Sequence, residues 1–208
     1  MNKSTERVLC FPRELLDRLG SFQGFKPDDG AIVEGFLTSN QARFIDRDSA
    51  ETDPSWKQLI PYVVLTSKEK ILHYVRGKKT GEDRLKSLGS VGVGGHISTT
   101  DHTLFKQDLR EVFAAGMMRE IDEEVEIQSP FTEEIKGLIN DDSNPVGMVH
   151  LGLLVVCTLE KPRISKREAS ITSLAFLNLS ELRKRIETLE TWSQIVVGNW
   201  NTIRSDTR

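Results

Sequence analysis

The chain has 208 residues, of which 38% are hydrophobic and 28% charged, and its formal net charge is −3. This length suits one domain with elaborations, and the charge excludes a basic field that would attract nucleic acid nonspecifically. Cys10 and Cys157 lie far apart in apolar contexts, which favours buried free thiols over a disulfide and fits a reducing cytoplasm. No stretch approaches ~18 apolar residues, so we expect neither a signal peptide nor a membrane span.

The first 58 residues are the least regular part of the sequence. Pro12 to Leu19 predicts a short helix with proline near its start, residues 31–37 predict a strand, and 36–56 predict a surface loop. We therefore expect residues 1–58 to be an N-terminal extension packed on a core formed by residues 59–208, with the two parts in one continuous domain.

Regular strand patterns begin at Leu59. The apolar, β-branched runs 59–66 and 69–77 are separated by Ser67-Lys68 and predict a hairpin. Residues 77–86 are polar and predict a loop, and residues 87–97 predict a third strand that leads into a glycine turn.

The C-terminal half also alternates between strand and helix patterns. Residues 146–159 form the longest apolar run and predict a central strand, after a mixed segment at 130–144. A further strand is expected around 174–177. A closing helix over 181–197, with Ser180 as its N-cap, completes the pattern.

An acidic helix is expected between these halves, over 111–127. At about 100° per residue, Glu120, Glu123 and Glu124 fall within an arc of roughly 100°. The other side carries an apolar stripe of Ala114, Met118, Ile121 and Val125. Three neighbouring carboxylates repel one another, and Arg119 is one counter-charge. A divalent cation such as Mg²⁺ is a better one, although acidic helical faces are also common as solvated surface.

The spacing of these charges resembles the box of the Nudix hydrolase family, G-x5-E-x7-R-E-U-x-E-E-x-G-U, where U is a bulky apolar residue. Seven residues separate Glu111 from Arg119-Glu120, and Glu123-Glu124 follows at the family's distance. Glu126 stands where the family has its late glycine.

The front of the box also differs from the family pattern. Gly94-Gly95 is the counterpart of its first glycine, but fifteen residues, in place of five, separate Gly95 from Glu111. We therefore expect a loop insertion of ten residues between the glycine turn and the helix, within 96–107, which the weak length dependence of loop-closure entropy tolerates. A capping box formed by Asp108 and Glu111 is expected to start the helix.

The resemblance implies an α/β fold, the Nudix α/β/α sandwich with a mixed sheet. It implies Mg²⁺ or Mn²⁺ as cofactor, with Glu120 and Glu124 as the main ligands and Glu123 as a ligand or its partner. Arg119 would hold these carboxylates by a bidentate ion pair, and Glu111 would support the site from nearer the helix start.

Substrate-binding residues are implied around the glycine turn. Gly94 and Gly95 would bring the backbone close to the metal and the substrate. Arg76, together with Lys78, Lys79 and Arg84, could contact phosphates, although solvation explains such a run equally well.

The general base is left open by the sequence. Glu168 is the distal candidate, and an exposed charge explains it more simply. His96 and His150 are read as structural residues, because a lone histidine near a strand is more often structural than a ligand. His73 and His102 receive no functional role.

The implied activity is hydrolysis of a diphosphate bond in a nucleoside diphosphate linked to another moiety, by metal-activated water. It would be a cytoplasmic enzyme with a small nucleotide-type substrate, no stable nucleic-acid complex and no membrane association. Because dimers are common in the family, a homodimer is compatible with the resemblance.

Two other functions fit parts of the pattern. The departures at the first glycine and at Glu126 allow a non-catalytic Nudix-fold module that binds a nucleotide, although such a module has no need for every acid. An isoprenoid-diphosphate isomerase, also found on this fold, would need a cysteine in the site. Neither Cys10 nor Cys157 has such a context.

Overall fold

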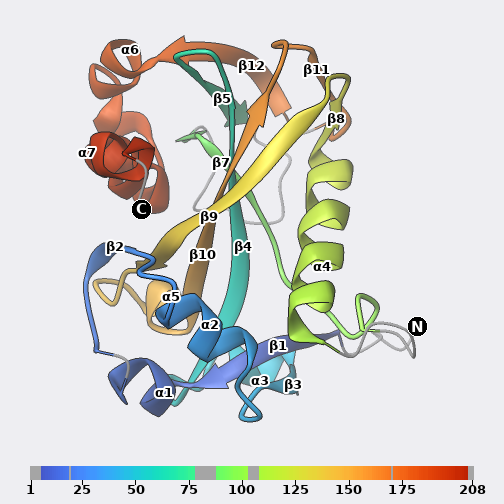
Figure 1. The fold of residues 1–208 in the computed structure, drawn as a ribbon, viewed down its shortest axis with the longest axis vertical. Coiled ribbons are helices and arrows are strands. Elements are labelled where there is room, and N and C mark those ends of the chain that lie inside the picture. Colours follow the sequence, from blue (N-terminus) through green and yellow to red (C-terminus); the bar gives the residue numbers. More distant parts are fainter. Residues whose placement is uncertain (1–5, 19, 78–87, 103–107, 170, 206–208) are drawn as a thin grey trace.

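A mixed sheet forms the middle of the computed structural model, which describes residues 6–18, 20–77, 88–102, 108–169 and 171–205 (Figure 1). The main strand order is β12-β5-β4-β10-β9-β2, in which β10 is parallel to β4 and antiparallel to β9. The strands are β1 (Arg7–Pro12), β2 (Gly24–Pro27), β3 (Arg43–Asp46), β4 (Trp56–Ser67), β5 (Lys70–Arg76), β6 (Gly89–Ser90), β7 (Gly92–Gly94), β8 (Val125–Ile127), β9 (Phe131–Asn140), β10 (His150–Leu159), β11 (Ile164–Lys166) and β12 (Ile171–Asn178).

Helices cover both faces of this sheet (Figure 1). The helices are α1 (Arg13–Arg18), α2 (Ile32–Leu37), α3 (Arg47–Ala50), α4 (Leu109–Glu124), α5 (Pro145–Met148), α6 (Leu179–Arg183) and α7 (Thr191–Arg204), with a 3₁₀ turn at Ile186–Thr188. Alternate residues of β4 point to opposite faces: Val63 packs in the cluster that contains α4, and Val64 in the cluster that contains α7. The predicted α/β/α sandwich with a mixed sheet is therefore confirmed.

The N-terminal segment contributes to the same core. Strand β1 pairs with β3 and with β4, and the Phe11 ring meets Phe36 of α2 edge to face, with 5.3 Å between ring centroids. The predicted helix after Pro12 is present as α1, whereas the strand predicted over 31–37 is wrong, because this segment forms α2. The loop predicted over 36–56 is also wrong in part, since it contains β3 and α3.

The start of α2 explains why the strand prediction failed. The Asp29 carboxylate accepts hydrogen bonds from the backbone N–H of Ala31 and Ile32, and Asp28 accepts from Val33. These bonds satisfy the free N–H groups that begin a helix. The buried residues Ile32, Val33, Phe36 and Leu37 then recur with helical spacing.

The predicted hairpin is confirmed as β4 and β5, joined through a two-residue turn in which Lys68 has φ 57°. The third strand is divided into β6, which pairs with β5, and β7, which pairs with β4. The central strand begins at His150, later than predicted, because Asn144 caps a short helix with Pro145 in its first turn.

Two C-terminal predictions are corrected. The mixed segment after Pro130 contains the ten-residue strand β9, which the sequence analysis did not identify. The single closing helix is two helices: α6 begins with a capping box at Asn178, and α7 begins at Thr191, where the Glu190 carboxylate accepts from the N–H groups of Trp192 and Ser193. Leu189 has an extended backbone that ends the preceding 3₁₀ turn, and the Glu190 side chain then caps the start of α7.

The acidic helix is confirmed as α4, but its apolar face differs from the predicted stripe. The buried residues are Val112, Phe113, Gly116, Met117, Ile121 and Glu124, while Val125 already belongs to strand β8. Asp108 caps the helix by accepting from the N–H of Arg110. Within the described ranges, no helix combines the length and the apolar character needed to cross a membrane. Both cysteines are buried and free, and burial raises the pKa of each thiol to about 12.

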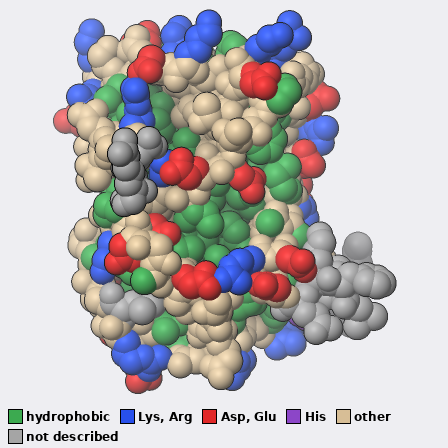
Figure 2. Space-filling view, in the orientation of Figure 1, with side chains coloured by type: hydrophobic (Ala, Val, Ile, Leu, Met, Phe, Trp, Pro, Cys, Tyr) green, Lys and Arg blue, Asp and Glu red, His purple; other side chains and the backbone are tan. Residues whose placement is uncertain are grey.

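One face of the molecule carries an apolar patch, seen at the centre of Figure 2 between α2, α4 and β9. A groove of about 470 Å³ lies there, lined in part by Val33, Phe113, Met117 and Ile135, and the Glu34–Arg110 ion pair borders it. None of its lining residues borders the larger cavity described below.

Candidate active site

A cavity of about 1150 Å³ opens beside the C-terminal half of α4. Its walls come from the glycine turn after β7, from α4, from the segment around α5 and from the start of α7. The lining residues that matter below are Tyr62, Gly94, Gly95, His96, Arg119, Glu120, Glu123, His150, Glu190 and Trp192. The cavity thus has an acidic wall on α4 and an aromatic wall near α7.

Arg119 organises the acidic wall. Its Nε and Nη2 donate to the two oxygens of Asp101, each at 2.9 Å, so this pair is bidentate. Its Nη1 donates to Glu120 at 2.7 Å and to Glu123 at 3.2 Å. Nη2 also donates to the carbonyl oxygen of His96 at 2.8 Å, which fixes the turn after Gly95. The hydrogen bonds to Asp101 raise the pKa of the guanidinium, which therefore stays charged.

The three carboxylates around Arg119 differ in exposure. The Asp101 side chain is 4% exposed, Glu120 15% and Glu123 59%. Burial raises the pKa of Glu120, while the hydrogen bond from Arg119 opposes this shift. One positive charge against three negative ones leaves the cluster with an excess of two negative charges, and its members Arg119, Glu120 and Glu123 line an open cavity. Such a cluster favours a bound cation.

Gly95 lies against Glu120. A Cβ atom at position 95 would be 2.0 Å from Glu120 Oε2, so a side chain there would displace the carboxylate. Gly94 is also closely packed, since a Cβ there would lie 2.9 Å from the carbonyl oxygen of Pro61. The structure therefore brings the predicted glycine turn and the predicted helix together at Glu120.

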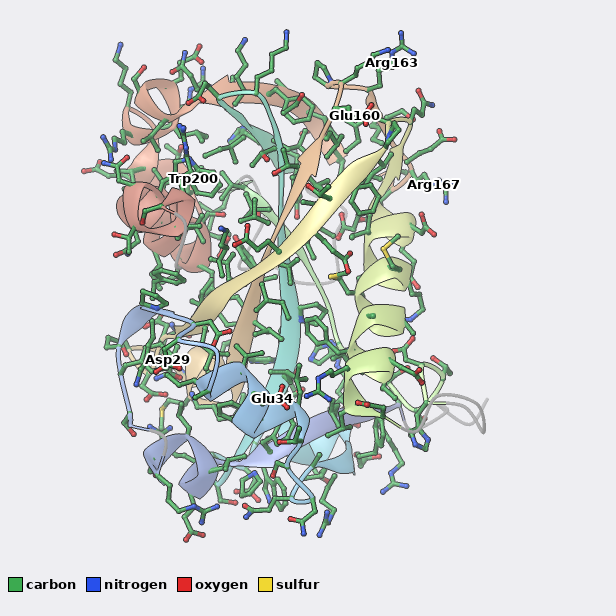
Figure 3. All side chains as sticks on the ribbon, viewed as in Figure 1. Asp29, Glu34, Glu160, Arg163, Arg167 and Trp200 are labelled. Atoms are coloured by element: carbon green, nitrogen blue, oxygen red, sulfur yellow. The ribbon has the colours of Figure 1, made fainter. Side chains whose placement is uncertain are left out.

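Glu124 differs from the other acids of the helix. It is the last residue of α4, only 7% exposed, and it is not among the residues that line the cavity. Its carbonyl oxygen accepts from the N–H groups of Arg167 and Glu168. This contact places Arg167 beside the end of α4 (Figure 3) and connects the Glu168 backbone to the acidic helix.

The aromatic wall is held by a polar network at the start of α7. The Tyr62 hydroxyl donates to Glu190 at 2.5 Å and lies 2.8 Å from the Ser193 hydroxyl. The Tyr62 and Trp192 rings meet edge to face at 5.4 Å between centroids. Sequence reasoning missed this wall, because Tyr62 and Trp192 are far apart in the chain and each resembles a core residue.

This chain is similar to known proteins in sequence and in structure. No protein-family model matches it. Protein YmaB of Bacillus subtilis (strain 168) is 35% identical over 206 residues, covering 95% of this chain and 98% of that protein. The crystal structure of Tm1382, assigned as a Nudix hydrolase, superposes with a TM-score of 0.78 at 32% identity, covering 94% of this chain and 98% of that one. The chain belongs to the Nudix hydrolase family.

Two more distant structures support the Nudix fold alone. The Nudix hydrolase from Alicyclobacillus acidocaldarius has a TM-score of 0.53 at 12% identity and covers 68% of this chain and 90% of that one. The bifunctional NMN adenylyltransferase/ADP ribose pyrophosphatase from Francisella tularensis has a TM-score of 0.50 at 14% identity, covering 71% of this chain and 42% of that one.

The structure gives a second way to align the front of the Nudix box. Five residues separate Gly95 from Asp101, which is the family spacing from the first glycine to the first acid. Asp101 is also the carboxylate that binds Arg119 in two places. Glu111, in contrast, is exposed in the first turn of α4, eight residues and about 12 Å of helix before Arg119. The spacing from Gly95 was the signal that could have identified Asp101.

The extra ten residues then lie between Asp101 and Arg119, which are separated by seventeen residues in place of seven. Part of this longer connection belongs to α4, which begins at Leu109. The predicted insertion within 96–107, ahead of Glu111, stays a prediction. Residues 103–107 lie outside the described residues.

The structure also explains why Glu126 can stand where the Nudix box has its second glycine. Glu126 lies in the short strand β8, paired with Ser165 of β11. Among the described residues, Lys68 is the non-glycine residue with positive φ, so the backbone at Glu126 does not require glycine. The Glu126 carboxylate instead accepts from Ser165 and Gln128.

The residues predicted to bind substrate phosphates lie, in part, outside the described part of the chain. The side chain of Arg76, and Lys78, Lys79 and Arg84, lie outside the described residues. Asp141 and Asp142 follow strand β9 and have different partners. Asp141 accepts from the N–H and hydroxyl of Ser143, and so does stabilise a turn. Asp142 instead pairs with buried Lys57 at 2.7 Å.

Proposed function

We propose that this protein is a Mg²⁺- or Mn²⁺-dependent Nudix hydrolase that cleaves a diphosphate bond in a nucleoside diphosphate linked to another moiety. The observation that carries the proposal is the cluster of Asp101, Glu120 and Glu123 around Arg119. It has an excess of two negative charges and borders a cavity of about 1150 Å³. The predicted ligand Glu124 and the predicted supporting acid Glu111 stay predictions.

The donor set fits a hard divalent cation. Glu120 and Glu123 present carboxylate oxygens to the cavity. Gly95 lies so close to Glu120 that its backbone is within reach of a cation bound there, whereas a Cβ at this position would obstruct the carboxylate. Bound there, the cation would offset phosphate charge and lower the pKa of a coordinated water. Arg119 would keep Glu120 and Glu123 in position, and Asp101 would keep Arg119 in position.

The rest of the cavity supports a nucleotide-type substrate. Trp192 and Leu189 give an apolar surface at the α7 end, on which a nucleobase could pack, while the acidic wall takes the phosphates through the cation. The Francisella protein, whose structure holds AMP and a manganese ion, has the same fold and supports this ligand class. A small-molecule substrate also agrees with the chain's net charge of −3, which does not favour nucleic acid.

A binding module without turnover is less well supported. The two sequence departures that favoured it, at the first glycine and at Glu126, have structural explanations in the spacing of Asp101 and in strand β8. The isomerase is also less well supported, because Cys10 and Cys157 are buried and neither lines the cavity.

The test is an assay with Mg²⁺ or Mn²⁺ against nucleoside triphosphates, ADP-ribose, dinucleoside polyphosphates and NADH, with products identified. Substituting Glu120→Gln should lower kcat by about 100-fold or more, since loss of several kcal/mol of charge stabilisation corresponds to such factors. Asp122→Asn, an exposed change on the same helix, is the matched control. A wild type inactive on every substrate, or a fully active Glu120→Gln, would contradict the proposal.

A further inference from the structure

Two histidines that were read as structural residues meet in the cavity. His96 follows the glycine turn and His150 begins β10, and their Nε2 atoms are 3.3 Å apart. Glu51, the residue after α3, places Oε1 3.8 Å from both Nε2 atoms. These three groups come from three distant segments of the chain, so no sequence motif could have shown that they meet.

The tautomer of His150 turns a lone pair toward this meeting point. Its Nδ1 lies 2.7 Å from the carbonyl oxygen of Val146, which can only accept, so Nδ1 carries the proton. In the neutral ring Nε2 is then unprotonated and faces His96 and Glu51. Metal-binding histidines are oriented in this way, by a hydrogen bond from the other ring nitrogen to a carbonyl or carboxylate.

The spacing of the three atoms fits one ion. Nitrogen and oxygen ligands about 2.0–2.1 Å from a tetrahedral ion are roughly 3.3–3.4 Å from one another. The two histidine nitrogens are already 3.3 Å apart, and the Glu51 oxygen needs a shift of about half an ångström.

A fourth, independent observation comes from Gln58. This residue is fully buried, and neither its Nε2 nor its Oε1 has a hydrogen-bond partner among the described residues. Gln58 of β4 is in register with His150 of β10, so both side chains lie on the same face of the sheet. A buried amide without partners is rare and calls for a ligand or water beside it.

We propose that Glu51, His96 and His150 form a second cation site, distinct from the carboxylates of α4, which takes a divalent transition metal ion such as Zn²⁺. Two imidazoles and one carboxylate suit Zn²⁺, whereas Mg²⁺ prefers the all-oxygen set on α4. His96 and His150 line the cavity, so a fourth coordination position is open to water or to a group of a bound ligand.

One nearby charge acts against the site. Arg47 Nε is 3.8 Å from the same Glu51 oxygen that would bind the ion. Arg47 is also paired with Glu6, through Nη1 at 2.8 Å, so its charge is balanced without Glu51. Zn²⁺ can therefore take Glu51 without leaving the guanidinium unpaired. The proposal is independent of the hydrolase assignment, since it concerns a different donor set.

The experiment is a titration of the metal-free full chain with Co²⁺, followed by its visible spectrum, and with Zn²⁺ in competition with a chelator. The Glu120→Gln/Glu123→Gln double variant, in which the α4 carboxylates are neutral, should still bind one equivalent, with the cobalt spectrum of a site that has imidazole ligands. Wild type should show the same spectral component. Glu51→Gln, His96→Gln and His150→Gln should each lower Zn²⁺ affinity at least tenfold, as even outer-shell changes do. The exposed His102→Gln is the matched control and should bind as wild type does.

Two results would overturn the proposal. One is a wild type that takes up neither ion, in which case the histidine nitrogens share an ordinary hydrogen bond. The other is binding lost in the double variant and retained in Glu51→Gln and His96→Gln, which would assign the ion to α4. Glu51→Gln keeps the test decisive if a buried His150 variant fails to fold, because the Glu51 side chain is 35% exposed.

Discussion

Two networks in this protein each join basic side chains to carboxylates, but they differ in net charge. Lys57 is 1% exposed and donates to Asp142, to Asn140 and to the carbonyl oxygen of Gly147, while Arg13 binds the same Asp142. Asp141 also acts on Lys57 through its charge, so two cations face two carboxylates, and the network ties β4 to the turn after β9. The network of Arg119 has one cation for three carboxylates and faces a cavity. We infer that a balanced network stabilises a fold, whereas an unbalanced one at a cavity binds a ligand.

The largest expected effect separates these two roles. Lys57→Met should lower the free energy of unfolding by about 3 kcal/mol, because it removes the buried donor to Asn140 and to the carbonyl oxygen of Gly147, and one of the two counter-charges of Asp142. The activity of the remaining folded molecules should change little, since Lys57 does not line the cavity. Urea denaturation and an assay at low temperature measure the two quantities. A stable variant without activity would contradict the comparison.

Asp101→Asn should affect both stability and activity. Loss of a charged, bidentate partner of Arg119 should cost about 2 kcal/mol of stability and lower activity, because Arg119 would no longer fix Glu120. Glu111→Gln, measured beside it by thermal unfolding and kcat, should have the smaller effect. The reverse order of the two variants would restore Glu111 as the first acid of the box.

Gly95→Ala tests the position of the Glu120 carboxylate without changing any charge of the Arg119 network. A methyl group 2.0 Å from the Glu120 oxygen must displace that carboxylate, so we expect about a tenfold loss of kcat, or about 1.4 kcal/mol of barrier. Gly198→Ala is a suitable control, because a Cβ there meets nothing within 4 Å. Equal activity in both variants would show that the position of Glu120 does not limit the reaction.

The smallest effect concerns pH and the Lys57 network. Burial opposes ionisation of Asp142, but hydrogen bonds from Arg13 and Lys57 prevail and hold the pKa of Asp142 below its usual range. The stabilisation is therefore complete above the unfolded pKa, about 3.9, and is lost as pH falls through the lower folded value. In urea melts, the stability difference between wild type and Asp142→Asn should begin to shrink below about pH 4. A difference that grew on acidification would contradict this sign.

Local patterns allowed the family, the α/β/α fold and the acidic helix to be predicted. Helix α4 was indicated by the spacing of its charged residues, and the hairpin β4–β5 by two β-branched runs around a short turn, which are both local features of the sequence. Segment 31–37 was misread because its helix is started by Asp28 and Asp29, whose capping bonds depend on a turn that the apolar pattern does not reveal. The break before α7 was likewise hidden, since Glu190 acts as a cap only after an extended residue.

The candidate site divides in the same way. Arg119, Glu120 and Glu123 are neighbours on one helix, so their sequence alone determined that they share a face. The partner of Arg119, the close approach of Gly95 to Glu120, and the meeting of Glu51, His96 and His150 were decided only by the tertiary structure. These groups come from separate segments, and pairing of distant strands is what brings them within bonding distance. Residue spacing along the chain carries no record of such contacts.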